Sequence, residues 1–476
     1  MGQKEQMLYE KVATDVESQI RRGAIQVGDK ITSIRKQSEI MGVSVNTVLQ
    51  AYLLLEQKGL IESRAQSGFY VSAFQITEEV RKETEIQKKP AAIQIPDLVA
   101  EMLEVASRAN YLNLGAACLA SELYPNAALA RITRSVLRKT AEINARYEFS
   151  PGSLELRQQI AKRLTRQGNK VAAEDLVITN GAQEALHLAL RTLMKNGDTV
   201  LIESPNYFGV LQAIADLGMK VIEVPADARW GVDPDDVKKI LSRYKIAGAV
   251  MMPNFNNPLG SRMPDANKKE VMKVFSKFGT PVIEDDVYGD LDFSGVRPKL
   301  LRHFDEEGLV LTCSSFSKTV APGSRCGWIL PGKHLSLFRN YQISSTLGIN
   351  RLQQKILAEF LASGSYERHL RKLRPLLHLQ VQKISQAVLR YFPEGTRITQ
   401  PQGGFMLWVE LPKEIDSVLL YSQAAAKKIS IAPGVMFSAN GNYRNYIRLN
   451  CGLPWRSDVE AAIKTLGGLA RQQVEG

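Results

Sequence analysis

Cysteine is scarce in this chain, and long apolar runs are missing. The four cysteines are widely separated and none belongs to a Cys-x-x-Cys pair, which argues against a zinc site and against a disulfide framework. No apolar run approaches the roughly 20 residues that a membrane-spanning helix needs, and Met1–Glu10 is polar, so neither a membrane span nor a secretory signal is expected. The sequence therefore predicts a cytoplasmic protein with neither a metal centre nor a membrane partner.

The residues that are present suffice for several domains. At 476 residues, of which 44% are hydrophobic, the chain can bury a substantial core and is long enough for two or three domains. The net charge of +12 is compatible with a nucleic-acid partner. This charge is unevenly placed, because residues 1–75 hold nine basic and eight acidic side chains whereas residues 351–390 hold eight basic and two acidic ones.

The first 75 residues show a pattern of three helices and a hairpin. Apolar residues recur every fourth position over residues 8–20, as on one face of a helix. A second helix is expected to begin near Thr32 or Ser33 and to end at Gly42, and Ser44 then opens a third. The hairpin, or wing, consists of two short strands, 60–62 and 69–71, and a turn at 66–68 between them.

The rest of the chain has a different organisation. Residues 76–96 are charged and poor in aromatic side chains, which predicts a linker. From residue 97 to 476, apolar strand-like runs alternate with helical stretches, a pattern typical of an α/β fold with a largely parallel sheet. The runs are 176–179, 199–202, 221–224, 249–252, 281–283 and 309–313.

The third helix carries short polar side chains where a DNA-recognition helix would present them. Ser44, Asn46 and Thr47 fall in its first turn, and such side chains reach base edges or phosphates in DNA-binding helices. Arg35 and Lys36, at the start of the second helix, would lie near backbone phosphates. Each residue also has an ordinary structural explanation, Ser44 as a helix cap and Arg35 as a solvated surface charge.

Taken together, these segments resemble the winged helix of the GntR family over nearly their whole length. The resemblance rests on short motifs in a fixed order: Gly23 with Gly28-Asp29-Lys30-Ile31, Ser33-Ile34-Arg35, Val43-Ser44-Val45-Asn46-Thr47-Val48, Ala51-Tyr52, Leu55-Glu56, Gly59-Leu60-Ile61 and Ser67-Gly68-Phe69-Tyr70-Val71. One departure is Thr32, where the family usually has proline, and this change should loosen the helix start without removing the contacts. The resemblance implies a domain that binds operator DNA.

The clearest chemical motif is Ser315-Phe316-Ser317-Lys318, followed by Arg325. A lone lysine after a strand is ordinarily a surface residue. Here hydroxyls flank the lysine and an arginine follows it, a set that suits an aldehyde cofactor carrying a phosphate. Lys318 would form the internal Schiff base, and Ser315 and Arg325 would hold the phosphate. The segment after residue 179 ends a strand and opens a helix, so the amides of Ala182 and Gln183 can also cradle phosphate.

From about Leu112 to the end, the order of such motifs resembles fold-type I aminotransferases, which have a large and a small subdomain and bind pyridoxal 5'-phosphate. The resemblance implies that Asp285 pairs with the pyridine nitrogen and that Tyr207 stacks on the ring. The ring hydroxyl would be bonded by Tyr288 and Asn257. A buried core tyrosine is the alternative for Tyr207, and an ordinary turn is the alternative for Asn257 and the proline after it.

Two further residues are assigned by the same resemblance. Tyr147 matches a tyrosine that reaches the phosphate of the partner subunit, which implies a homodimer. Arg448 matches an arginine that forks onto a substrate carboxylate, here the carboxylate of an effector.

A GntR-type winged helix at the N-terminus (the head) joined to an aminotransferase-like remainder (the body) resembles the MocR subfamily of bacterial regulators. The implied function is transcription regulation in response to an amine or amino acid that displaces Lys318 from the cofactor and is gripped by Arg448. Two alternatives stay open. One is a catalytically active aminotransferase with an accessory DNA-binding domain, and the other is a DNA-binding scaffold without a cofactor.

The basic region 351–390 permits one more interpretation. Apolar residues at helical spacing leave its basic side chains on the solvent side, which ordinarily means only a solvated helix surface. Since the head is nearly neutral, we also consider that DNA touches the face from Arg368 to Arg374.

Overall fold

The structure is a computed structural model that describes two compact units, one within residues 1–79 and one within residues 80–476. The residues described are 8–21, 25, 28–57, 60–64, 68–71, 80, 89–93, 98–140 and 142–475. Gly23, the wing residues Gln66 and Ser67, and most of the predicted linker 76–96 therefore lie outside the described residues. We call the first unit the head and the second the body, and describe each by itself.

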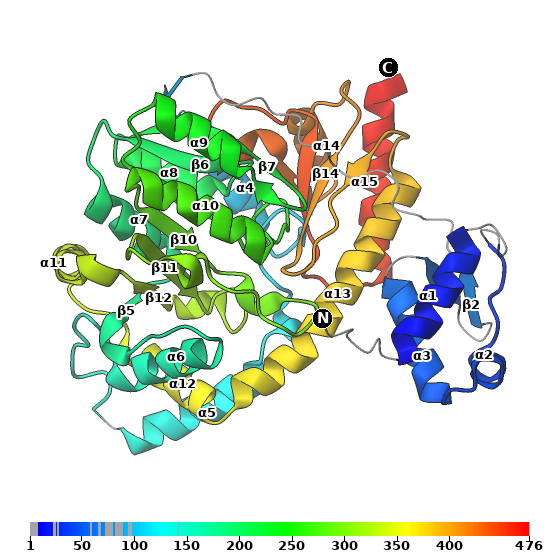
Figure 1. Ribbon diagram of the computed structural model, residues 1–476, viewed down its shortest axis with the longest axis horizontal. Helices are drawn as coiled ribbons and strands as arrows, with labels where there is room; N and C mark the ends of the chain where they lie inside the picture. Colours follow the sequence, from blue (N-terminus) through cyan, green and yellow to red (C-terminus); the bar gives the residue numbers. More distant parts are fainter. Residues whose placement is uncertain are drawn as a thin grey trace. The chain divides into compact units, whose positions relative to one another are not determined.

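Within its described residues, the head contains three helices and two antiparallel strands (Figure 1). The elements are α1 (Leu8–Arg21), α2 (Ile34–Met41), α3 (Val45–Gln57), β1 (Ile61–Arg64) and β2 (Gly68–Val71). Val12, Val16 and Ile20 of α1 pack with Val48 and Tyr52 of α3 in one buried cluster. The fourfold spacing of the apolar residues produces this helix–helix contact, and the predicted winged-helix arrangement is confirmed.

The body is built on a sheet of nine strands among the described residues. Its central strands run parallel in the order β7-β6-β9-β10-β11, and at one edge the antiparallel strand β12 lies between β11 and β5. The bounds are β5 (Val177–Thr179), β6 (Thr199–Ser204), β7 (Lys220–Asp227), β9 (Gly248–Met251), β10 (Val282–Asp285), β11 (Val310–Ser315) and β12 (Gly327–Leu330). The strands β3 (Ala91–Ala92) and β8 (Gly231–Val232) both pair with β7. The predicted α/β fold with a largely parallel sheet is confirmed.

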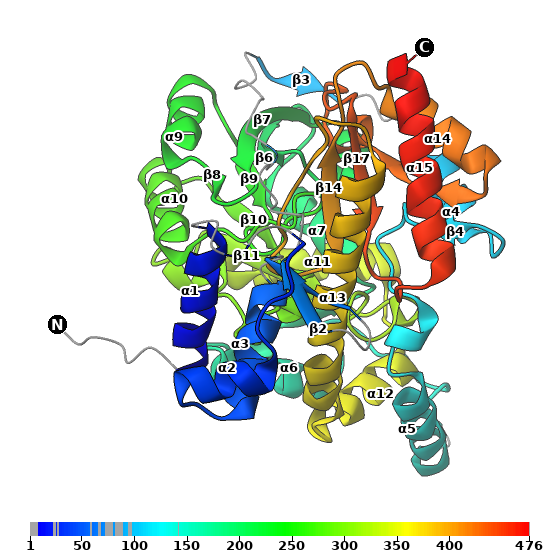
Figure 2. The same cartoon turned by 90° about the vertical axis from the view of Figure 1, so that its right-hand side faces the viewer.

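Helices cover both faces of this sheet. In Figure 2, α9 (Pro234–Arg243) and α10 (Asp265–Phe278) lie on one side of the strands, and α7 (Ala182–Leu193) lies on the other. On the α7 side, α8 (Phe208–Asp216) and α11 (Leu335–Thr346) complete a buried apolar cluster with the strands. A second cluster joins the β5–β12 edge to α5 (Asn126–Lys139), α6 (Leu154–Arg166), α12 (Arg351–Ala362) and the first half of α13 (Ser365–Tyr391).

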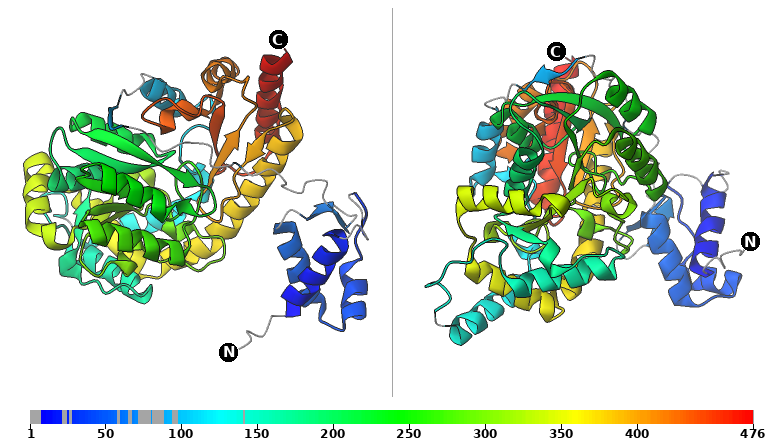
Figure 3. Two further views of the ribbon diagram at one scale, coloured as in Figure 1. Left: turned by 45° about the horizontal axis from the view of Figure 1, so that its top comes forward. Right: turned by 60° about the vertical axis from the view of Figure 1, so that its left-hand side comes forward.

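A smaller subdomain follows the long helix α13 (Ser365–Tyr391). Its sheet has the order β13-β14-β17-β16, and α13 lies beside the last helix, α15 (Ser457–Glu475), as Figure 3 shows. The strands are β13 (Arg397–Ile398), β14 (Met406–Glu410), β16 (Ala432–Pro433) and β17 (Tyr446–Asn450), and α14 (Ser417–Ala426) adds a helix. After α4 (Leu98–Ser107), β4 (Leu112–Asn113) pairs with β15 (Ile429–Ser430) and so joins the start of the body to the small subdomain.

The described helices give no evidence of a membrane span. Across the described residues, no helix combines the length and the apolar character needed to cross a bilayer.

Candidate functional site

The carboxyl ends of the parallel strands of the body surround a cavity of about 110 Å³. Such an edge is where open α/β sheets bind ligands. Most of the residues predicted for the cofactor line it together: Ala182, Gln183, Tyr207, Asn257, Asp285, Tyr288, Ser315, Lys318 and Arg325. Leu186, Met252, Val287 and Ser317 complete the lining. Residues that lie far apart in the sequence thus share one pocket.

Lys318 lies just beyond β11, with its amine inside the pocket. The amine donates a hydrogen bond to the carbonyl oxygen of Ala117 at 2.8 Å and lies 6.0 Å from the ring centre of Tyr288. Burial lowers the pKa of Lys318. A larger fraction of neutral amine follows, which is the form that can attack an aldehyde.

One end of the pocket is suited to an anion. Gly181, at φ 86°, begins α7 without a side-chain cap, which leaves the first amides of the helix for a ligand. The guanidinium of Arg325 lies beside this turn and donates to the oxygen of Asn180 at 3.1 Å and to the hydroxyl of Ser317 at 3.4 Å. A Cβ atom at Gly181 would lie 2.5 Å from this guanidinium, so the close approach requires glycine.

The other end of the pocket is suited to a planar heterocycle. Burial, with a smaller contribution from Asp286, raises the pKa of Asp285 to about 7, and a ring nitrogen that carries a proton would favour the ionised carboxylate. The buried hydroxyl of Tyr288 has no hydrogen-bond partner among the described residues although it lines the cavity. An unmet polar group of this kind is explained by a ligand that supplies the partner. The pocket therefore fits pyridoxal phosphate.

Arg448 lies on β17 next to this end of the pocket and is fully buried. It donates to the side-chain oxygen of Asn257 at 3.1 Å and to the carbonyl oxygen of Gly115, and its Nε has no partner among the described residues. Residues 112–118, which we call the strap, thus contact both basic side chains of the site, since Ala117 accepts from Lys318. The sequence motifs gave no indication of the strap.

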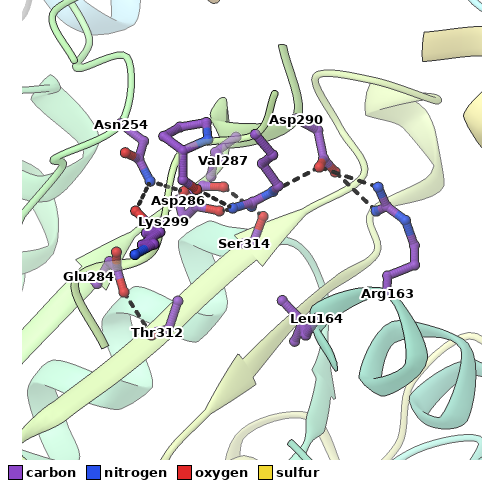
Figure 4. Close-up of polar contacts among 12 residues, drawn as sticks. Arg163, Leu164, Asn254, Glu284, Asp286, Val287, Asp290, Lys299, Thr312 and Ser314 are labelled. Atoms are coloured by element: carbon purple, nitrogen blue, oxygen red, sulfur yellow. Dashed lines mark hydrogen bonds and ion pairs between the residues drawn. The ribbon is translucent and has the colours of Figure 1, made fainter. Parts of the chain in front are cut away.

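A network of charged side chains lies at the end of β10, and Figure 4 shows part of it. Asp290 accepts from Arg163 at 3.1 Å, from Arg297 at 2.9 Å and from the hydroxyl of Tyr366 at 2.7 Å. Arg297 also binds Asp286, the residue next to Asp285. The network continues through Asn254 to Lys268 and connects α6, α10 and α13 to the end of β10. It fixes the backbone that presents Asp285 to the pocket.

Tyr147 does not reach the pocket of its own chain. Its side chain is 72% exposed and stacks on Phe149, which is 54% exposed, with the ring centres 5.6 Å apart. Its assignment to the phosphate of a partner subunit stays a prediction.

In the head, the predicted DNA-reading residues lie on the surface of the second and third helices. Arg35, Lys36, Ser44 and Asn46 are exposed, and Thr47 is half-buried. The Ser44 hydroxyl accepts from the amide of Thr47 at 3.1 Å and lies 2.8 Å from the Thr47 hydroxyl. Ser44 therefore caps α3, which was the structural alternative to a role in DNA reading. Asn46 makes no capping bond of this kind within the described part of the head.

Comparisons with known proteins agree with this division. Residues 8–71 match the model of bacterial regulatory proteins of the gntR family, and residues 109–466 match aminotransferase class I and II. The uncharacterized HTH-type transcriptional regulator YjiR of Escherichia coli is 36% identical over 98% of this chain and 99% of its own length. The chain belongs to the MocR-type regulators.

Aminotransferases such as LysN match the body of this MocR-type regulator. The crystal structure of LysN, an alpha-aminoadipate aminotransferase from Thermus thermophilus that was complexed with N-(5'-phosphopyridoxyl)-L-leucine, superposes with a TM-score of 0.74 at 28% identity. The superposition covers 96% of the LysN chain but only 80% of this chain. The body therefore has the predicted aminotransferase fold, and the regulator is favoured over an enzyme with an accessory domain because relatives named as regulators match the whole chain.

Proposed function

We propose that this MocR-type regulator binds operator DNA through its head and senses an amine or amino acid at pyridoxal phosphate held in its body. The observation that carries the proposal is the single pocket that brings together Lys318, Asp285 and Arg325, joined in one chain to a gntR-family head. A homodimer in the cytoplasm is proposed with it, since the exposed Tyr147 is then available to a second subunit.

The pocket residues divide the tasks of holding the cofactor. Arg325, Ser315 and the first amides of α7 would hold the phosphate, Asp285 the ring nitrogen, and Tyr288 with Asn257 the ring hydroxyl. Pyridoxal phosphate supplies an aldehyde carbon that links covalently to amines. Lys318 provides the buried amine for that link when no effector is present.

The strap would couple effector binding to the rest of the body. An effector carboxylate would compete with the Gly115 carbonyl for Arg448. The carboxylate is charged and can accept two hydrogen bonds from the guanidinium, so it is the stronger acceptor. A Cβ atom at Gly115 would lie 2.5 Å from the hydroxyl of Ser430, so the strap reaches Arg448 because this residue is glycine. Displacement of the strap would act on β4, on α4 and on the chain that leads back toward the head. The effector would act through its unequal affinity for two arrangements of the body, one with the strap on Arg448 and one with the strap displaced.

Arg448→Met is expected to weaken the response to carboxylate-bearing effectors by about 30-fold or more, because truncation of one partner of a buried charge pair costs about 2–5 kcal/mol. The measurement is the effector concentration that produces half of the change in operator affinity. Amines without a carboxylate provide the control, since their response should not depend on Arg448. An unaltered response to amino acids in this variant would remove Arg448 from the effector site.

Asn46→Ala is expected to reduce the discrimination between operator and random DNA by about 1–3 kcal/mol. Arg35→Ala should instead weaken binding to both kinds of DNA and lower the salt dependence, because it removes a phosphate contact. Both effects are measured by fluorescence anisotropy over a range of salt concentrations. If both variants bind operator and random DNA as the wild type does, α3 is not the reading element.

The complete pocket also favours a limited second activity. Residues able to hold both the cofactor and a substrate carboxylate are present, so half-reactions of transamination are chemically possible. Release of a keto acid from the purified protein, measured over one turnover, tests this activity separately from operator binding.

A further inference from the structure

A second concave surface of the body lies away from the cofactor pocket. The start of α5 and the first turns of α13 line a groove of about 570 Å³. Its walls carry Arg131 from α5 and Arg368, Arg371 and Lys372 from α13, all exposed. Tyr124 and Phe360 belong to its lining as well.

The basic side chains continue along α5. Arg131, Arg134 and Arg138 are spaced by three and four residues, which places them on one face of the helix, and all three are exposed. The helix contains no acidic residue. Two helices from distant parts of the sequence thus each present a row of positive charge beside one groove. We call these residues the basic surface: Arg131, Arg134, Arg138, Arg368, Arg371 and Lys372.

Two acidic residues beside the groove are engaged elsewhere. Glu367, next to Arg368, pairs with Arg163 at 2.9 Å, and Glu122 pairs with Arg456 at 3.2 Å. No ion pair within the described part of the chain involves any residue of the basic surface. Its charge is therefore available to a ligand.

The geometry also corrects the face suggested by the sequence. Arg374 does not belong to the basic surface, because its Nε donates to the backbone oxygen of Asp290 at 2.8 Å. Lys355 and Arg351 pair with Glu155 and Glu148 at 2.9 Å and 3.4 Å. Three exposed basic residues thus stand together at the start of α13, Arg368, Arg371 and Lys372, and α5 adds three more.

We propose that the basic surface binds the phosphate backbone of operator DNA outside the segment read by the head. This inference rests on the proposed function, namely that the head binds an operator. Duplex DNA carries one negative charge per about 1.7 Å of its axis, so a row of three arginines can meet several phosphates. The nearly neutral head, with nine basic and eight acidic residues, provides few such contacts itself. Arginine rows without acidic neighbours contact phosphates irrespective of base sequence.

The test compares two triple variants with the same change in charge. Arg131→Glu, Arg368→Glu and Arg371→Glu reverse the basic surface. The control reverses exposed lysines on α9 and α10 instead, as Lys238→Glu, Lys269→Glu and Lys277→Glu. Each protein is titrated with two fragments selected from random DNA by the wild type, a minimal footprint and one extended on each side by about two helical turns, or about 20 bp.

Reversal of the basic surface is expected to lower affinity for the long fragment by at least tenfold and to reduce its salt slope by about 2–3, at roughly 0.9 per lost phosphate contact. Affinity for the short fragment should match that of the control triple variant. Equal affinity of the two triple variants for the long fragment would overturn the inference. Binding of an acidic polypeptide to the basic surface would not then restore it. Failure of the wild type to select any fragment would instead refute the proposed function. Retained cofactor absorption verifies that the variants are folded.

Discussion

Lys318→Ala is expected to abolish covalent attachment of pyridoxal phosphate. Among the residues that line the pocket, Lys318 provides the only amine, and burial lowers its pKa toward the neutral form. The protein is treated with borohydride in the presence of the cofactor, and its mass and visible absorption are then recorded. The wild type should gain one reduced pyridoxyl group and the variant none.

The matched control is Lys333→Ala, which removes an exposed lysine after β12. It should retain the adduct of the wild type. Operator binding without effector should also persist in Lys318→Ala, because the head is a separate compact unit. A stoichiometric reducible adduct in Lys318→Ala would show that another residue holds the cofactor.

Asp290→Asn is expected to lower the free energy of unfolding by about 3–5 kcal/mol, because it leaves two buried arginines short of their shared anion. Arg163 and Arg297 both contact this carboxylate, and their side chains are only 15% and 8% exposed. The loss is measured by urea unfolding at neutral pH. Asp265→Asn serves as the control, since Asp265 pairs with Lys299 at 3.7 Å on the surface and such pairs contribute about 0–1 kcal/mol. Equal losses in the two variants would contradict a structural role for the network.

The same carboxylate predicts a dependence of stability on pH. Burial alone would raise the pKa of Asp290, but Arg163 and Arg297 hold it well below its ordinary value. A carboxylate with a depressed folded-state pKa stabilises the protein above the unfolded pKa of about 3.9, and this stabilisation is lost as the pH falls below it. The difference between wild type and Asp290→Asn should therefore shrink in acid.

The sequence predicted those helices and strands that a pattern within a short segment identifies. Fourfold apolar spacing identified α1, the cap at Ser33 marked the start of α2, and apolar runs identified six body strands to within three residues at either end. The strand β12 was missed because its four residues, Gly327–Leu330, come just after Arg325 and overlap the stretch that was assigned to the cofactor motif. Its place beside β5 depends on long-range pairing.

The same distinction applies to the candidate site. Lys318 and Asp285 stand in short motifs, so their assignment needed no knowledge of the fold. Arg163 and Arg297 carry no motif, and they meet at Asp290 only because α6 packs near the end of β10. Arg374 shows the limit of periodicity, since helical spacing groups it with Arg371 but says nothing of the carbonyl of Asp290 that it reaches.

The central claim is that one molecule couples amine capture in the body to operator binding by the head. Its most direct test is the operator affinity of the cofactor-loaded protein, measured with a panel of amino acids and amines and repeated with Lys318→Ala. At least one amino acid is expected to change the operator affinity of the wild type, and Lys318→Ala is expected not to respond. A wild-type protein that binds its operator and links covalently to the cofactor, but whose operator affinity no amine changes, would contradict the account.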